Sequence, residues 1–251
     1  MGPVLKATGL SVGRGGQVVL RGISLSVARG ERIALVGANG SGKTTLLRVL
    51  AGIDQALAGQ LSCNGQPLPR GPARVGQLGV LFQSETAAPF SVRELVSLGL
   101  GLDRAPSPRQ RALVDAALAR VLLTGLADRP VASLSGGEAQ RAAIARAIVA
   151  GPEVLLLDEP TNHLDPARRA AFLALLDDLR GSIAVVLATH DLDCAAAADR
   201  VLLLGAGTIL AEGPPSSVLT PENLHAAFGV AVRRVADPAG GRLFLRVEAA
   251  S

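Results

Sequence analysis

Nine consecutive residues constrain this chain more than any other stretch: Gly37-Ala38-Asn39-Gly40-Ser41-Gly42-Lys43-Thr44-Thr45. They fit the pattern G-x-x-x-x-G-K-[ST], between an apolar run of strand length (31–36) and a segment with helical apolar spacing (45–51). Glycines let successive backbone N–H groups turn inward, and the following helix presents its positive end. The lysine adds a point charge for the outer phosphates, and Thr44 adds a hydroxyl ligand for Mg²⁺. The stretch therefore predicts a nucleoside triphosphate site, and its Lys-Thr pair argues against an ordinary glycine-rich turn.

Composition limits the remaining possibilities. With 251 residues, 49% of them hydrophobic, the chain can bury one large core, yet no window of about eighteen residues is free of charge. We therefore expect no membrane-spanning helix, and the first residues show neither a signal core nor a myristoylation pattern. Cys63 and Cys194 lack metal-ligand spacing, so we expect reduced thiols in a cytosolic protein.

The charge pattern disfavours a nucleic-acid partner. The 25 Lys and Arg residues are offset by 21 Asp and Glu residues, and no basic run stands out. Aromatic residues make up only 2% of the chain, with no Trp or Tyr, so a base-stacking platform is not expected. A solvated surface mildly rich in arginine explains the balance, and a side facing anionic lipid is a second interpretation.

The order of apolar segments predicts an α/β fold. Residues 4–30 read as antiparallel strands with a turn at 13–16, and continuous apolar strands at 78–82, 154–157 and 183–189 alternate with helical patterns. The block from about 84 to 133 is helical throughout, with a capping box at Ser91. We expect a mostly parallel sheet with an N-terminal antiparallel β subdomain and an inserted helical subdomain, together spanning 1–219. A short helix and β-hairpin would form a tail over 220–251.

A second informative stretch is Leu134-Ser135-Gly136-Gly137-Glu138, just before an amphipathic helix. Ser-x-x-Glu is a capping box, and that interpretation accounts for the serine and the glutamate. A capping box does not require glycine at the two positions between the serine and the glutamate, so Gly136 and Gly137 call for another explanation. They leave bare N–H groups and the Ser135 hydroxyl available to an anion.

Three further polar residues follow two apolar strands. Asp158 ends one strand, where a carboxylate suits Mg²⁺, and the adjacent Glu159 could orient and deprotonate an attacking water. A pair of surface acids beginning a loop is the competing interpretation. His190 ends the next strand, so we expect it at the same edge of the sheet. His163 and His225 have no such context and are unassigned.

Together these stretches resemble the ATP-binding subunit of an ATP-binding-cassette (ABC) transporter over essentially the whole chain. The resemblance assigns the following parts: Gly37–Thr44 to Walker A, Gln83 to the Q-loop, Leu134–Glu138 to the signature, Val154–Glu159 to Walker B, residues 162–165 to the D-loop and His190 to the switch histidine. It implies ATP as ligand, Thr44, Gln83 and Asp158 at Mg²⁺, and Lys43, Gln83, Glu159 and His190 in hydrolysis.

The resemblance also implies partners. Two copies would hold two ATPs head to tail, each between Walker A of one copy and Ser135-Gly136-Gly137 of the other. A separate permease would dock near Gln83 at the cytoplasmic face of a bacterial inner membrane. The family usually has an aromatic residue near Arg14 that stacks on adenine. The Arg14 guanidinium could stack there instead, or be a solvated turn residue.

The tail is similar to the branch that serves importers of iron-siderophores, haem and cobalamin, in which a substrate-binding protein delivers the cargo. The stretch 90–96 agrees with that branch. Two alternatives are a soluble ABC ATPase of translation or DNA repair, and a non-catalytic ATP-dependent interaction module. The first normally carries a second cassette or long insertions, and the second would have lost Lys43 or Glu159. Neither feature is seen, so we expect an importer ATPase.

Overall fold

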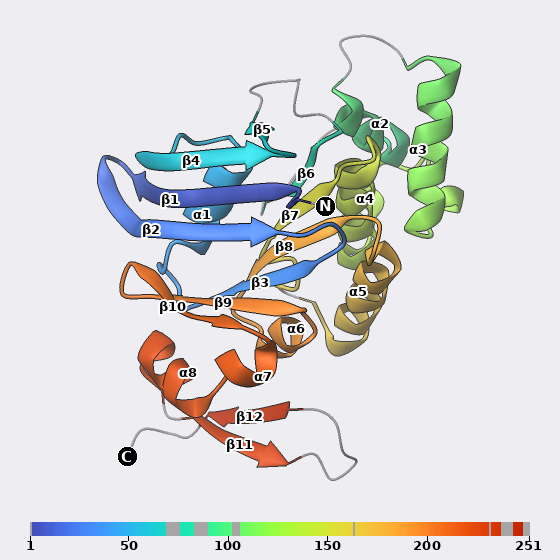
Figure 1. Ribbon diagram of the computed structural model, residues 1–251. Coiled ribbons are helices and arrows are strands. Elements are labelled where there is room, and N and C mark those ends of the chain that lie inside the picture. Colours follow the sequence, from blue (N-terminus) through green and yellow to red (C-terminus); the bar gives the residue numbers. More distant parts are fainter. Residues whose placement is uncertain are drawn as a thin grey trace.

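The computed structural model describes residues 2–68, 76–82, 90–101, 106–162 and 164–230, and the backbone of 232–236 and 243–247. A six-stranded sheet forms the centre, a four-stranded antiparallel sheet lies to one side of it, and most of the described helices lie on the other side (Figure 1). None of the helices in these ranges is long and apolar enough to cross a membrane. The predicted α/β fold with a mostly parallel sheet is confirmed.

The central sheet has the strand order β10-β9-β3-β8-β7-β6, and every neighbouring pair except β9–β10 is parallel. Its strands are β3 (Arg32–Val36), β6 (Leu78–Leu81), β7 (Val154–Asp158), β8 (Ala184–Thr189), β9 (Arg200–Gly205) and β10 (Thr208–Gly213). Side chains alternate between the two faces of the sheet, so Ile33 and Leu35 join one core and Ala34 and Val36 the other. Both faces are covered, which explains the continuous apolar strands.

The antiparallel sheet has the order β2-β1-β4-β5, with β1 (Leu5–Arg14), β2 (Gln17–Val27), β4 (Ala58–Cys63) and β5 (Gln66–Pro67). The expected turn at 13–16 is shorter than predicted, because β1 continues to Arg14. The apolar stretches 18–20 and 23–27, which Arg21-Gly22 separates in the sequence, form one strand, β2. Register shifts in the β1–β2 pair absorb the irregular stretch between them.

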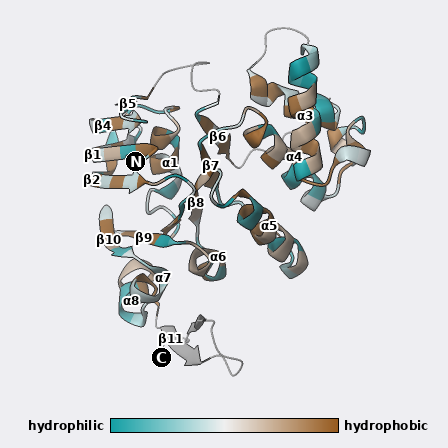
Figure 2. Cartoon of the chain, turned by 45° about the vertical axis from the view of Figure 1, so that its right-hand side comes forward, coloured by the Kyte–Doolittle hydropathy of each residue, from teal (hydrophilic) through white to brown (hydrophobic). Residues whose placement is uncertain are grey.

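Helices cover both faces of the central sheet. The helices are α1 (Lys43–Leu50), α2 (Val92–Ser97), α3 (Pro108–Arg120), α4 (Gly136–Ile148), α5 (Pro166–Leu179), α6 (Leu192–Ala196), α7 (Pro215–Val218) and α8 (Pro221–Phe228). Three 3₁₀ turns, η2 (Leu98–Leu100), η3 (Thr124–Leu126) and η4 (Val131–Ser133), join the helical block. Helix α1 packs in the core shared with the antiparallel sheet, whereas α4 and α5 pack in the core of the opposite face (Figure 2).

The capping box predicted at Ser91 is confirmed, and the next helix of the block has one as well. Ser91 caps α2 and Ser107 caps α3, each as a complete capping box. Strand β6 lies at the edge of the sheet and is less buried than the other parallel strands. Its Gly79 is buried, whereas Leu78, Val80 and Leu81 are only partly buried and pack against the edges of the two cores. Strands β9 and β10 form a hairpin over 200–213, where no strand was expected from the sequence.

The end of the chain forms the predicted short helix, α8, capped by Thr220 and ended by Gly229. Leu224 of α8 is fully buried in the core beside β9, so this helix packs on the main body. Strands β11 (Val232–Ala236) and β12 (Leu243–Val247) pair antiparallel as the expected hairpin. The proposed division of the chain at 219/220 stays a prediction.

Candidate nucleotide site

The phosphate-loop stretch lies where β3 ends and α1 begins, as predicted. Gly42 precedes the helix with a φ of 97°, a left-handed conformation that favours glycine. A Cβ on Gly37 would lie 2.6 Å from the Leu204 carbonyl oxygen, so that position also requires glycine. The backbone therefore forms a tight loop at the positive end of α1, which is the geometry of an anion site.

The Ser41 hydroxyl provides an independent test of whether this loop suits a ligand. Its Oγ is buried and has no hydrogen-bond partner among the described residues. Buried hydroxyls are normally paired, because an unpaired one costs about 1–3 kcal/mol. A phosphate oxygen would satisfy the hydroxyl, so the loop fits an oxyanion ligand.

Lys43 is almost completely buried, with 6% of its surface exposed. Its Nζ donates hydrogen bonds to the carbonyl oxygens of Gly37 at 2.8 Å and Ala38 at 3.2 Å, and lies 3.6 Å from Glu159 Oε1. These contacts compensate the buried charge. They also hold the ammonium group beside the loop, where an outer phosphate would meet it.

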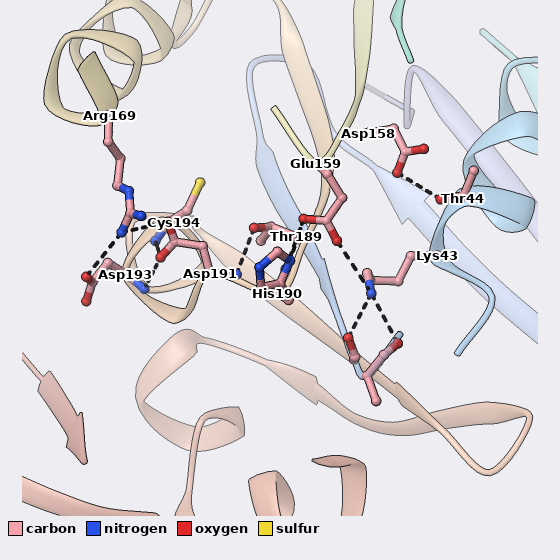
Figure 3. Close-up of polar contacts among 12 residues, drawn as sticks. Lys43, Thr44, Asp158, Glu159, Arg169, Thr189, His190, Asp191, Asp193 and Cys194 are labelled. Atoms are coloured by element: carbon pink, nitrogen blue, oxygen red, sulfur yellow. Dashed lines mark hydrogen bonds and ion pairs between the residues drawn. The ribbon is translucent and has the colours of Figure 1, made fainter. Parts of the chain in front are cut away.

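Thr44 and Asp158 fit the predicted Mg²⁺ site. The Thr44 hydroxyl donates to Asp158 Oδ1 at 3.0 Å, so two oxygen ligands lie side by side (Figure 3). Burial raises the pKa of the Asp158 carboxyl, and the Thr44 hydrogen bond opposes that effect. Within the described ranges no three His, Cys, Asp or Glu side chains form a metal cluster. Mg²⁺ suits such a site because it keeps several waters and takes few protein ligands.

Glu159 and His190 meet at the ends of the neighbouring strands β7 and β8. Glu159 Oε2 lies 2.9 Å from His190 Nδ1 and accepts a hydrogen bond from the His190 backbone N–H at 3.3 Å. Glu159 adopts a φ of 46°, which a non-glycine residue rarely does. Its own N–H donates to the Ala188 carbonyl oxygen at 2.9 Å. This backbone turns the carboxylate toward Lys43 and His190, and such strain concentrates at functional sites.

The Ser135-Gly136-Gly137 stretch lies elsewhere. Ser135 caps α4, and its backbone N–H donates to Glu138 Oε2 at 2.8 Å, which lowers the pKa of Glu138. The Gly136 and Gly137 N–H groups lie in the first turn, where a helix offers them no partner. Because α4 packs on the opposite face of the sheet from α1, one chain does not bring this stretch to the phosphate loop.

Four further residues were considered for the site, and two of them, Arg14 and His225, belong to the described part of the chain. Gln83 and His163 lie outside it. Arg14 is exposed at the end of β1, where it pairs with Gln17 of β2, and its side chain has no hydrogen bond or ion pair with another described residue, so adenine stacking stays a prediction. His225 Nδ1 lies 3.3 Å from the Val230 carbonyl oxygen, to which it donates when it carries the ring proton, at the end of α8 and away from this site.

Sequence analysis missed residues that support the site. Gln140 of α4 donates to the Pro160 carbonyl oxygen, in the loop that follows Glu159. Asp191, directly after His190, caps α6 and pairs with Arg169 of α5. The His190-Asp191 order after a strand is a capping signal that could have been recognised. Nothing in the sequence indicates the contacts of Gln140 or Arg169.

Comparison with known proteins identifies the family of this chain. The profile of the ABC transporter family matches residues 20–162. The hemin import ATP-binding protein HmuV of Streptomyces coelicolor is 41% identical over 97% of this chain and 90% of its own length. The spermidine/putrescine import ATP-binding protein PotA of Legionella pneumophila is 37% identical, over 94% of this chain and 66% of its own. The cobalamin import ATP-binding protein BtuD of Halobacterium salinarum is also 37% identical, over 94% and 62%.

Solved structures give the same result. An inward-facing metal-chelate type ABC transporter matches with a TM-score of 0.86 and 28% identity, over 98% of both chains. A dimeric bacterial ABC transporter cassette matches with a TM-score of 0.74 and 26% identity, over 84% of this chain and 98% of its own. The range matched by the family profile, residues 20–162, includes the phosphate loop and the Asp158-Glu159 pair. The chain belongs to the ABC transporter family.

Proposed function

We propose that this chain hydrolyses ATP to drive import through a separate bacterial permease. Members of this family are ATPases coupled to transport, and the chain has the lysine, carboxylates and histidine that the resemblance assigns to hydrolysis and Mg²⁺ in the described part of the site: Lys43, Asp158, Glu159 and His190. The observation that carries the proposal is the convergence of Lys43, Glu159 and His190 beside a glycine loop with an unpaired Ser41 hydroxyl.

The roles follow from position and charge. Loop N–H groups and Lys43 would bind the phosphates, while Thr44 and Asp158 would hold Mg²⁺, which supplies neutralisation of the phosphate charge. Glu159 would accept the proton of the attacking water, with His190 orienting its carboxylate. Gln83 is proposed beside the metal and the water.

Substitution of the proposed base tests hydrolysis. We expect Glu159→Gln to lower kcat for ATP by about 10²–10⁴-fold, because it removes the base but keeps the shape. Glu153→Gln is the matched control, since Glu153 pairs with Arg29 away from this site. If wild-type chain binds ATP without turnover, an ATP-dependent interaction module becomes the better interpretation. Full turnover in Glu159→Gln would remove Glu159 from its role.

We also propose a head-to-tail pair of chains. The glycine N–H groups at the start of α4 suit an anion but lie away from the phosphate loop of the same chain, so a second chain would have to bring the two together. A mixing experiment tests this arrangement. Lys43→Ala removes the phosphate charge, and Ser135→Asp keeps a capping side chain but adds a negative charge that repels phosphate. Each variant alone should be inactive. Their equimolar mixture should recover about a quarter of the wild-type rate, since half of randomly mixed dimers are mixed and each keeps one intact site. A mixture as inactive as its components would contradict the composite site.

The importer assignment rests on the relatives named for import. It places the chain at the cytoplasmic face of the membrane, bound to a permease that receives cargo from a substrate-binding protein. Affinity purification of the tagged chain from detergent-solubilised native membranes tests this proposal. A many-span permease should copurify. A ribosome or DNA in its place would favour a soluble ABC ATPase of translation or repair.

The proposed cargo is an iron chelate, haem or cobalamin. Its support is the hemin and cobalamin relatives and the metal-chelate type structure. A polyamine is the second candidate, because the spermidine/putrescine relative matches nearly the same share of this chain. Binding of haem, cobalamin, ferric siderophore and spermidine to the copurified substrate-binding protein would decide between the two classes.

A further inference from the structure

Arg169 extends from α5 to Asp191 and Asp193 at the start of α6, and Asp191 directly follows His190 in the chain (Figure 3). Its Nη1 lies 3.0 Å from Asp191 Oδ2 and 3.9 Å from Asp193 Oδ2. The two carboxylates differ in environment, because the Asp191 side chain is 11% exposed and that of Asp193 is 71% exposed. Water solvates Asp193, so the guanidinium matters mainly to Asp191.

Asp191 depends on this charge. Its Oδ1 accepts hydrogen bonds from the backbone N–H groups of Asp193 and Cys194, and thereby caps α6. Its Oδ2 is buried and accepts no hydrogen bond from the described residues. The approach of Arg169 at 3.0 Å is thus an ion pair without hydrogen-bond geometry. A buried carboxylate oxygen without this pairing would be an uncompensated charge, which proteins avoid.

The peptide that bears His190 is held on both sides. On one side, Glu159 Oε2 contacts His190 Nδ1 and its backbone N–H. On the other side, the Asp191 N–H donates to Thr189 Oγ1 at 2.9 Å, and its carboxylate faces Arg169. Removing the charge of Arg169 leaves the hydrogen bonds of Asp191 to Thr189 and to the start of α6, but takes away the partner of the buried Oδ2 on the second side.

Arg169 also joins the two segments that leave the carboxyl ends of neighbouring strands. Glu159 follows β7, and the chain then runs through residues 160–165 into α5. His190 follows β8 and leads into α6. The ion pair is therefore a cross-link between the segment after Glu159 and the segment after His190, in addition to the direct contact of these two side chains.

We propose that Arg169 is a positioning residue for ATP hydrolysis, which holds Asp191 and thereby keeps His190 in place against Glu159. The inference rests on the proposed roles of Glu159 and His190. Arg169 touches neither of them, so it acts through Asp191. It is also remote from Lys43 and Thr44, so nucleotide binding does not depend on it.

Three substitutions isolate the ion pair. Arg169→Gln removes the charge and keeps much of the length. Asp191→Asn also removes the charge, and asparagine is as good a helix cap as aspartate, so α6 keeps its start. Asp193→Asn is the matched control, because it changes the exposed carboxylate that lies 3.9 Å from the same guanidinium.

We expect Arg169→Gln and Asp191→Asn each to lower kcat about tenfold, since small misplacements of catalytic groups cost up to about 100-fold. KM for ATP should stay within about twofold in both, because the phosphate contacts are unchanged. The double variant should be no slower than the slower single variant, since the two substitutions break one interaction. Arg169→Lys should recover part of kcat, and Asp193→Asn should match the wild type.

Each alternative result overturns the inference. An unchanged kcat in both single variants would show that the pair does not position His190. Multiplying effects in the double variant would show that the residues act separately. Thermal unfolding of every variant identifies a folding defect, and a fall in kcat that only follows lost folded protein would make Arg169 merely structural. If wild-type chain hydrolyses ATP and Glu159→Gln does not, the proposed function stands whichever way these variants behave.

Discussion

The left-handed backbone of Glu159 makes a quantitative prediction about stability. At a φ of 46°, a residue with a Cβ costs about 1–2 kcal/mol relative to glycine. Folding costs glycine about 0.5–1 kcal/mol more in conformational entropy than it costs alanine, because glycine is freer in the unfolded chain. The difference favours glycine by roughly 0.5–1 kcal/mol. We therefore expect Glu159→Gly to be more stable than Glu159→Ala.

The comparison between these two variants removes the other contributions. Both lose the contacts of the carboxylate with Lys43 and His190, so those losses cancel. Urea unfolding without nucleotide gives the two free energies of unfolding, and an ATPase assay should find both variants inactive. The glycine variant would then be the more stable protein without function, as expected for strain retained at an active site.

A second pair of variants provides the control. Glu153 precedes β7 and does not have a positive φ. There Glu153→Gly should be less stable than Glu153→Ala by about 0.5–1 kcal/mol, the ordinary cost of glycine. If Glu159→Ala were more stable than Glu159→Gly, as expected for the pair at Glu153, the strain argument would be refuted. The positive φ of Glu159 would then cost no measurable free energy.

Three other predictions concern buried charged or titratable groups. Arg32 is 2% exposed, and its guanidinium donates to Asp177 and to the Ala197 carbonyl oxygen. Asp177→Ala, which leaves the buried charge without its carboxylate partner, should lower the free energy of unfolding by about 1–3 kcal/mol in urea titrations, and by more than Arg32→Met does. Burial raises the pKa of Asp158, so this group should destabilise the fold as pH rises from 3.8 through its raised pKa. Asp158→Asn should then unfold at higher urea than wild type at pH 7 without Mg²⁺, and the gain should vanish in acid. Burial raises the pKa of the Cys194 thiol to about 12 and also raises that of Cys63, so iodoacetamide at pH 8 should label neither thiol until urea unfolds the chain. Labelling of native Cys194 at the rate of the unfolded chain would contradict its burial.

The parts of the site that follow from local chemistry could be predicted from the sequence. The loop before Lys43 needs glycine at fixed positions, and the structure shows the close contact of Gly37 and the positive φ of Gly42 that require it. Ser91 and Ser135 form complete capping boxes with residues three positions later. In each case the partners lie within a few residues, so spacing alone carries the information.

Other features depend on residues far apart in the chain. Strand β2 runs unbroken through Arg21 and Gly22 because pairing with β1 tolerates register shifts there, and a turn pattern cannot show this. The hairpin at 200–213 has an apolar strand whose partners come from β3 as well as β10. The contact of Arg169 with Asp191 joins α5, which follows β7, to the start of α6, which follows β8. An arginine on a helix is ordinarily solvated, so the sequence does not indicate this contact.

The contacts of Lys43 connect nucleotide binding with the state of Glu159. Lys43 Nζ has three oxygen neighbours: two loop carbonyl oxygens and Glu159 Oε1 at 3.6 Å. A phosphate is the stronger partner for an ammonium group, because it carries more negative charge than these neighbours. When the Lys43 ammonium group turns to a phosphate, Glu159 Oε1 loses this positively charged neighbour, while Glu159 Oε2 keeps its contact with His190. The same ammonium group therefore stabilises the site before ATP arrives and releases the proposed base when ATP binds.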